Sequence, residues 1–140
     1  MSVPQDIAPY LPHRPPLRFV QSLLECTKDE VITEGVFGPD SIVVDRERVV
    51  DNAALLELVA QSYAALRGFE DQQRGFATAN GYLVGITQFT AHAAAHAGEA
   101  LRVAVRTTGV FEDFFVGEGR VTRAGELIAE GTLKVWMQKD

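Results

Sequence analysis

The chain has 140 residues, a length that suits one domain with its own hydrophobic core. Its apolar fraction of 46% and charged fraction of 23% are typical of an ordinary globular protein. The formal net charge of -6 argues against the basic face that a nucleic-acid-binding protein needs, and no run of Lys or Arg offers a patch for a membrane surface. We therefore expect one globular domain over residues 1–140, with neither nucleic acid nor membrane among its partners.

The N-terminal part of the chain is rich in proline. Residues 1–16 contain five of the six prolines, which predicts irregular backbone with at most one short helical turn. This stretch has neither the basic flank nor the apolar centre of a signal peptide, so we expect a cytoplasmic protein. The single cysteine, Cys26, has no partner for an intrachain disulfide and no metal-ligand spacing around it, and we expect it to be a small buried or half-buried residue.

The next segment predicts two strands and then a loop. Residues 17–26 and 30–37 are typical of strands, with a turn between them at residues 27–30. Residues 38–48 include a β-branched run without a partner of clear register, and we interpret them as a long loop.

A long helix is predicted over residues 51–68. Asp51 or Asn52 can cap its start, and Gly68 stands where helices commonly stop. Apolar side chains lie on every face of this helix, so it should be buried on most sides. Residues 70–80 are polar and are interpreted as a connection.

The rest of the chain is predicted to form strands, with period-two alternation of apolar and polar residues in successive segments. The predicted strands cover residues 81–92, 101–111, 112–123 and 126–137, with a short turn at 123–126. Such segments predict an antiparallel sheet with one covered face. The fold class is therefore α+β, with the sheet wrapped around one long central helix. The outer strands would leave edges that a second copy can pair with, so we expect a dimer.

Two polar side chains interrupt the apolar helix. Glu57 and Gln61 are four residues apart, so they project from the same helix face. Burial would raise the pKa of Glu57 and suit it to general acid–base chemistry, and the Gln61 amide could orient the carboxyl or hold a substrate carbonyl. The alternative is that Glu57 pairs with Arg102 or Arg106, or faces solvent at a helix edge.

The start of this helix is a candidate binding site. Asn52 and Ala53 offer backbone N–H groups at the positive end of the helix dipole, where a developing oxyanion would be stabilised. Because every helix has such an end, this signal is weak alone.

The three histidines are weaker candidates. His92 and His96 are four residues apart, but no third ligand completes a metal set within their segment. We expect surface or loop histidines there and no metal site. His13 stands among prolines that would place its imidazole reproducibly, and its simplest role is a structural hydrogen bond to nearby backbone.

Three segments resemble the β-hydroxyacyl-acyl-carrier-protein dehydratases. Residues 11–20, LPHRPPLRFV, are similar to the opening signature of that family, and residues 55–64, LLELVAQSYA, are similar to its central-helix signature. Residues 81–103 resemble its third-strand segment, with Gly98 and Glu99 as a Gly-acid pair before the next strand. The match spans most of the chain in the right order.

The resemblance implies a dimeric hotdog fold with acyl tunnels at the dimer interface. The family removes water from a 3-hydroxyacyl thioester carried on phosphopantetheine, with a His/acid pair contributed across that interface and a helix-end amide on the thioester carbonyl. Carried over by position, Glu57 matches the acid and Gln61 its glutamine partner, while Asn52 and Ala53 match the helix start. No cofactor is implied beyond the phosphopantetheine arm of an acyl carrier protein or of CoA.

The catalytic histidine of the family does not carry over. It would fall near Val43, and no histidine lies between residues 14 and 91. In this respect the chain is most similar to a divergent subgroup of hotdog proteins associated with aryl-polyene-type pathways, which also replace the histidine region. Some hotdog subunits of that setting are thought to pair with a more conventional one. His13 is the candidate stand-in for the missing base if the N-terminal loop folds over the tunnel.

These observations give one leading hypothesis and two alternatives. The leading one is a 3-hydroxyacyl-ACP dehydratase-like enzyme, a lyase of fatty-acid or polyene biosynthesis with Glu57 as acid/base. The first alternative is a non-catalytic acyl-ACP-binding partner in a dehydratase heterodimer. The second is a hotdog acyl thioesterase in which the helix acid activates water. The partner would be acyl carrier protein or acyl-CoA, and the assembly a homodimer or a hotdog heterodimer.

Overall fold

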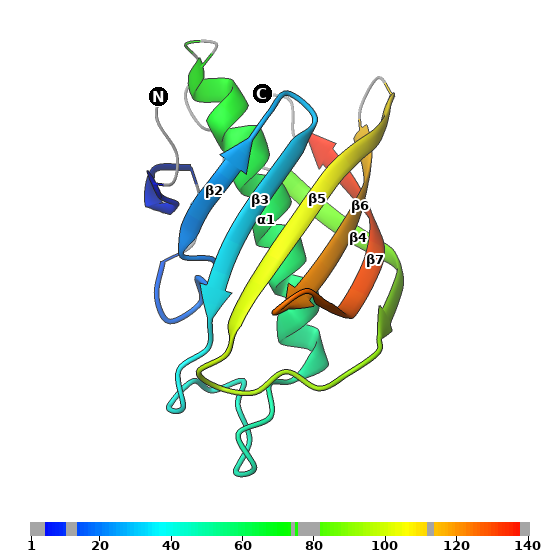
Figure 1. The fold of residues 1–140 in the computed structure, drawn as a ribbon. Helices are drawn as coiled ribbons and strands as arrows, with labels where there is room; N and C mark the ends of the chain where they lie inside the picture. Colours follow the sequence, from blue (N-terminus) through cyan, green and yellow to red (C-terminus); the bar gives the residue numbers. More distant parts are fainter. Residues whose placement is uncertain (1–4, 11–13, 74, 76–81, 112–113, 138–140) are drawn as a thin grey trace.

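The computed structural model describes residues 5–10, 14–73, 75, 82–111 and 114–137. One long helix lies against a curved antiparallel sheet that wraps around it (Figure 1). The elements in chain order are β1 (Gln5–Asp6), the 3-10 turn η1 (Ala8–Tyr10), β2 (Ser22–Cys26), β3 (Glu30–Val36), α1 (Asn52–Gln73), β4 (Tyr82–Ala91), β5 (Ala100–Phe111), β6 (Phe114–Arg123) and β7 (Glu126–Met137).

The sheet has seven strands in the order β1-β2-β3-β5-β6-β7-β4, and every neighbouring pair is antiparallel. The helix α1 connects β3, inside the sheet, with β4 at its far edge (Figure 1). The prediction of an antiparallel sheet around one long helix is therefore confirmed. No helix in the described ranges is long and apolar enough to cross a bilayer.

The helix starts where the sequence predicts and is buried along most of its length. Asp51 is the cap, because its Oδ1 accepts the N–H of Ala53 at 2.8 Å. Leu55, Leu58 and Leu66 are fully buried against the sheet. Burial of such side chains is the main favourable contribution to folding, at about 25 cal/mol per Å² of apolar surface.

The predicted helix end at Gly68 is wrong, because the helix continues through it to Gln73. A glycine is required at position 68 for another reason: a Cβ atom there would collide with the carbonyl oxygen of Tyr10. The absence of a side chain lets η1 pack directly on the helix, where the Tyr10 and Phe69 rings meet edge to face at 5.2 Å. The glycine therefore permits a close approach instead of ending the helix.

The predicted strand at residues 17–26 is also only partly correct. The strand β2 begins at Ser22, and residues 17–21 have no strand conformation. The backbone groups of Leu17 and Phe19 bond to the side chain of Gln61 instead of to a neighbouring strand. The short helical turn expected near the N-terminus is η1, whereas β1 was not predicted. Residues 112–113, which begin a predicted strand, lie outside the described residues.

Replacing Gly68 by alanine should destabilise the fold by about 1–3 kcal/mol, because the new methyl group must push η1 away from the helix. Denaturant unfolding measures this loss. Gly38→Ala is the matched control, since a Cβ at Gly38 meets nothing within 4 Å. Equal stability of the two variants would contradict the close approach at Gly68.

Candidate functional site

Gln61 is the buried polar centre of the candidate site. Only 1% of its surface is exposed. Its Oε1 accepts the N–H of Phe19 at 2.8 Å, and its Nε2 donates to the carbonyl of Leu17 at 2.8 Å. Because a backbone N–H can only donate, the amide oxygen must face Phe19, and this fixes which end of the amide is the NH₂ group. The NH₂ group therefore points towards Leu17 and Glu57.

Glu57 lies one turn earlier on the same helix face. The Nε2 of Gln61 donates to Glu57 Oε1 at 3.2 Å, which confirms that the two side chains meet. Glu57 is half-buried. The two arginines considered as its partners pair elsewhere: Arg102 with Glu34 at 3.8 Å and Arg106 with Glu118 at 3.6 Å.

The amide groups at the helix start are partly occupied within the chain. Asn52 is exposed, but the N–H of Ala53 already donates to the Asp51 carboxylate. An acyl carbonyl that bound to Ala53 would have to displace that carboxylate. The sequence predicts a cap at Asp51 or Asn52, and the choice of Asp51 by the structure is what occupies the Ala53 amide.

The region near Val43, where the resemblance would place a histidine, is apolar. Val43 packs against the core, and its carbonyl accepts the N–H of Asp51 at 2.8 Å. The side chain of Ile42 beside it is 79% exposed, and Leu17, in the segment bonded to Gln61, is 60% exposed.

His92 and His96 contact different carboxylates. His92 pairs with Glu130 at 2.7 Å, and His96 lies 3.4 Å from Glu99. Both are exposed, as predicted. In the ranges that the structure describes, no three His, Cys, Asp or Glu side chains form a group that could hold a metal ion. His13 lies outside the described residues, so its role stays a prediction.

Cys26 does not have the properties of a nucleophile. It is half-buried, and burial raises the pKa of its thiol to about 11, with the Glu70 carboxylate adding to the effect and Arg67 opposing it. A thiol with such a pKa is protonated at neutral pH, and the thiolate is the reactive form. Cys26 is therefore a structural residue.

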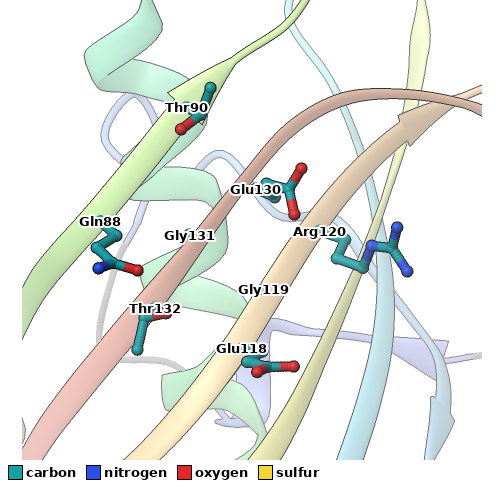
Figure 2. A pocket seen from close by; sticks show the side chains of 8 residues that line it. All are labelled: Gln88, Thr90, Glu118, Gly119, Arg120, Glu130, Gly131 and Thr132. Atoms are coloured by element: carbon teal, nitrogen blue, oxygen red, sulfur yellow. The ribbon is translucent and has the colours of Figure 1, made fainter.

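A hollow of about 440 Å³ lies on the face of the sheet opposite to the helix (Figure 2). Its polar lining comes from β4, β6 and β7, and the helix lies behind these strands in the view. The sheet separates this hollow from the helix: a Cβ at Gly119 of β6 would collide with Val59 of α1. This hollow is therefore separate from the Glu57–Gln61 pair, and an acyl tunnel between two protomers stays a prediction.

The comparison with known families identifies the chain. The model of the ApeP-like family, described as ApeP dehydratase, matches residues 5–140. The chain belongs to the ApeP-like dehydratase family. The resemblance to hydroxyacyl-carrier-protein dehydratases of the aryl-polyene type is thereby confirmed. No curated protein sequence matches the chain.

Solved structures show the same fold at low sequence identity. The dehydratase heterocomplex ApeI:P from Xenorhabdus doucetiae is 18% identical and superposes with a TM-score of 0.89, over 100% of this chain and 94% of that chain. An uncharacterized protein from Pyrococcus horikoshii is 13% identical, with a TM-score of 0.72 over 99% and 97% of the two chains. Mouse thioesterase superfamily member 2 is 16% identical, with a TM-score of 0.66 over 87% and 84%. The hotdog fold of this family member is therefore confirmed.

Replacing Gln61 by leucine should destabilise the protein by about 2–4 kcal/mol, because Phe19 N–H and the Leu17 carbonyl would be left without their partner. Denaturant unfolding again gives the loss. Gln21→Leu is the control: Gln21 also donates to a backbone carbonyl, that of Val36, but it is exposed, so water replaces the bond. A Gln61 variant as stable as this control would show that the hydrogen bonds of Gln61 to Leu17 and Phe19 do not hold the N-terminal segment.

Titration of the Cys26 thiol tests its assignment as a structural residue. The ultraviolet absorbance of the thiolate should rise with a midpoint near 11, which is the value that burial produces. An unperturbed thiol titrates at about 8.5. A midpoint at or below that ordinary value would contradict the burial of Cys26.

Proposed function

We propose that this chain supplies the acid of a dehydratase that converts 3-hydroxyacyl thioesters into 2-enoyl thioesters. The observation that carries the proposal is the Glu57–Gln61 pair on the central helix, with the amide fixed in one orientation by Phe19. One carboxyl oxygen of Glu57 accepts from Gln61, and the same carboxyl would carry the proton that is transferred. Membership of a dehydratase family supports this chemistry.

The reaction needs two groups that move protons. A base removes the proton from C2 while the protonated Glu57 delivers a proton to the hydroxyl on C3. The C2–H and C3–O bonds break, the C2=C3 double bond forms, and water leaves. The proton taken by the base then returns to Glu57 to restore the site. General acid–base help of this kind contributes roughly 10²–10⁴ in rate for each group.

We infer that the base is an imidazole from a second hotdog subunit. The resemblance would place a histidine near Val43, which is apolar and packs against the core, and the large apolar side chain of Ile42 beside it is exposed. A structural relative, ApeI:P, is a dehydratase heterocomplex, which supports an assembly of two different chains. His13 remains the candidate base if the imidazole comes from this chain.

The substrate would arrive on the phosphopantetheine arm of an acyl carrier protein or of CoA, and no further cofactor takes part. The backbone N–H at Asn52 is the proposed site for the thioester carbonyl, because the N–H of Ala53 is already bonded to the Asp51 carboxylate. Amide dipoles at a helix start stabilise an enolate oxygen as its charge develops.

The second candidate function is that of a binding partner without catalytic residues of its own. The apolar Val43 at the histidine position and the occupied Ala53 amide favour it. In that case the complex would dehydrate its substrate equally well with or without the Glu57 carboxyl.

The test is a dehydration assay of the complex with the hotdog partner from the same gene cluster. Glu57→Gln should slow formation of the enoyl thioester by roughly 10²–10⁴, since it removes one proton-transfer group. Glu70→Gln, on the same helix but beside Cys26, is the matched control and should leave the rate unchanged.

Further results of this assay distinguish the alternatives. His13→Gln should leave the rate unchanged if the partner supplies the imidazole, and should match the loss of Glu57→Gln if His13 is the base. An unchanged rate in Glu57→Gln would contradict the assignment of Glu57 and leave the binding-partner function. Release of free thiol, without an enoyl product, would indicate a thioesterase.

A further inference from the structure

A guanidinium at the end of β6 joins two parts of the chain that are distant in sequence. Arg123 donates from Nη1 to the carbonyl of Ala94 at 2.7 Å and to Glu99 Oε1 at 3.0 Å. Its Nη2 donates to Glu126 Oε1 at 2.7 Å. The same Glu99 oxygen accepts the backbone N–H of His96 at 2.6 Å. Arg123 and Glu99 therefore fix the segment at residues 92–99 to the turn between β6 and β7.

The segment at residues 92–99 holds in turn the chain that precedes the helix. Val50 donates its N–H to Ala95, Ala97 to Arg48 and Gly98 to Phe37, each at 2.8–2.9 Å. Val49 and His96 also form an antiparallel bridge. Ala95 is fully buried, so this contact is part of the core and not a surface association.

The chain held in this way ends at the start of α1. Asp51, the helix cap, follows Val50 directly and donates its own N–H to Val43. The Asp45 carboxylate accepts the N–H groups of Glu47 and Val49, both at 2.9 Å, which closes a tight turn within the same chain. The position of residues 43–51, and with it the helix start, therefore depends on the segment that Arg123 and Glu99 secure.

The Arg123–Glu99 contact differs from the other ion pairs of the sheet. Its side chains are 22% and 30% exposed, whereas those of Arg106 and Glu118 are 63% and 59% exposed. Burial works to raise the pKa of Glu99, but the His96 amide and the Arg123 guanidinium outweigh it and hold that pKa below its ordinary value. The charged form of Glu99 is thus the one that the fold favours.

We propose that Glu99 and Arg123 are positioning residues of the dehydratase site, which fix residues 43–51 and the helix start relative to Glu57. This proposal rests on the proposed function for its catalytic consequence. Its structural part stands on the hydrogen bonds alone. It also explains the role of Glu99, the acid of the Gly98–Glu99 pair. In the described contacts, Glu99 touches neither Glu57 nor Gln61.

Amide hydrogen exchange tests the structural part. In Arg123→Gln and in Glu99→Gln, the amides of Val50, Ala97 and Gly98 should exchange about tenfold faster or more, because a charge-assisted hydrogen bond is lost. Arg106→Gln is the matched control, since it removes an exposed ion pair on the same sheet. Unchanged exchange at these three amides, or equal acceleration throughout β5 and β6, would overturn the proposal.

Steady-state kinetics of the complex test the catalytic part. Misplacing the helix start should lower kcat several-fold with little change in KM, because the substrate still binds but its carbonyl is held less well where charge develops. A rise in KM alone, or the same kcat as Arg106→Gln, would contradict the positioning role. If the wild-type complex forms no enoyl product, the proposed function fails, while the exchange result still decides whether the two residues hold the segment.

Discussion

The structure depends on one buried amide. The side chain of Gln61 joins the N-terminal segment, through Leu17 and Phe19, to the middle of the central helix, and it also bonds to Glu57. An unpaired amide in this position would cost roughly 1–3 kcal/mol for each lost partner. All its groups are satisfied, so the amide has a single orientation, and the carboxyl that it contacts is held in a fixed place.

Two glycines let neighbouring elements pack closely against the helix. The missing side chain at Gly68 lets η1 lie on the helix, and the missing side chain at Gly119 lets β6 approach Val59. The helix is therefore covered by the sheet on one side and by the N-terminal segment on another. The Arg123–Glu99 contact fixes residues 92–99, which bond to the chain that precedes the helix. The start of the helix is therefore connected to the sheet.

The sequence was sufficient for the features that arise from local periodicity. The shared helix face of Glu57 and Gln61, a cap at Asp51 or Asn52 and the antiparallel strands of the second half are predictable, because each follows from local sequence signals. The non-local features were not. The local pattern predicts a helix end at Gly68, since the contact that explains this glycine, Tyr10, is distant in sequence. It likewise predicts a strand at residues 17–21, since their bonding partner is a helix side chain. No local pattern reports such contacts.

The central claim is that Gln61 acts through Glu57. A double-mutant cycle on the dehydration rate of the complex measures this directly, with Glu57→Gln, Gln61→Leu and the double variant. If Gln61 serves to orient Glu57, the double variant should be no slower than Glu57→Gln alone. Losses that multiply, so that the double variant is slower by the product of the two single effects, would show that the residues act independently and would contradict the account.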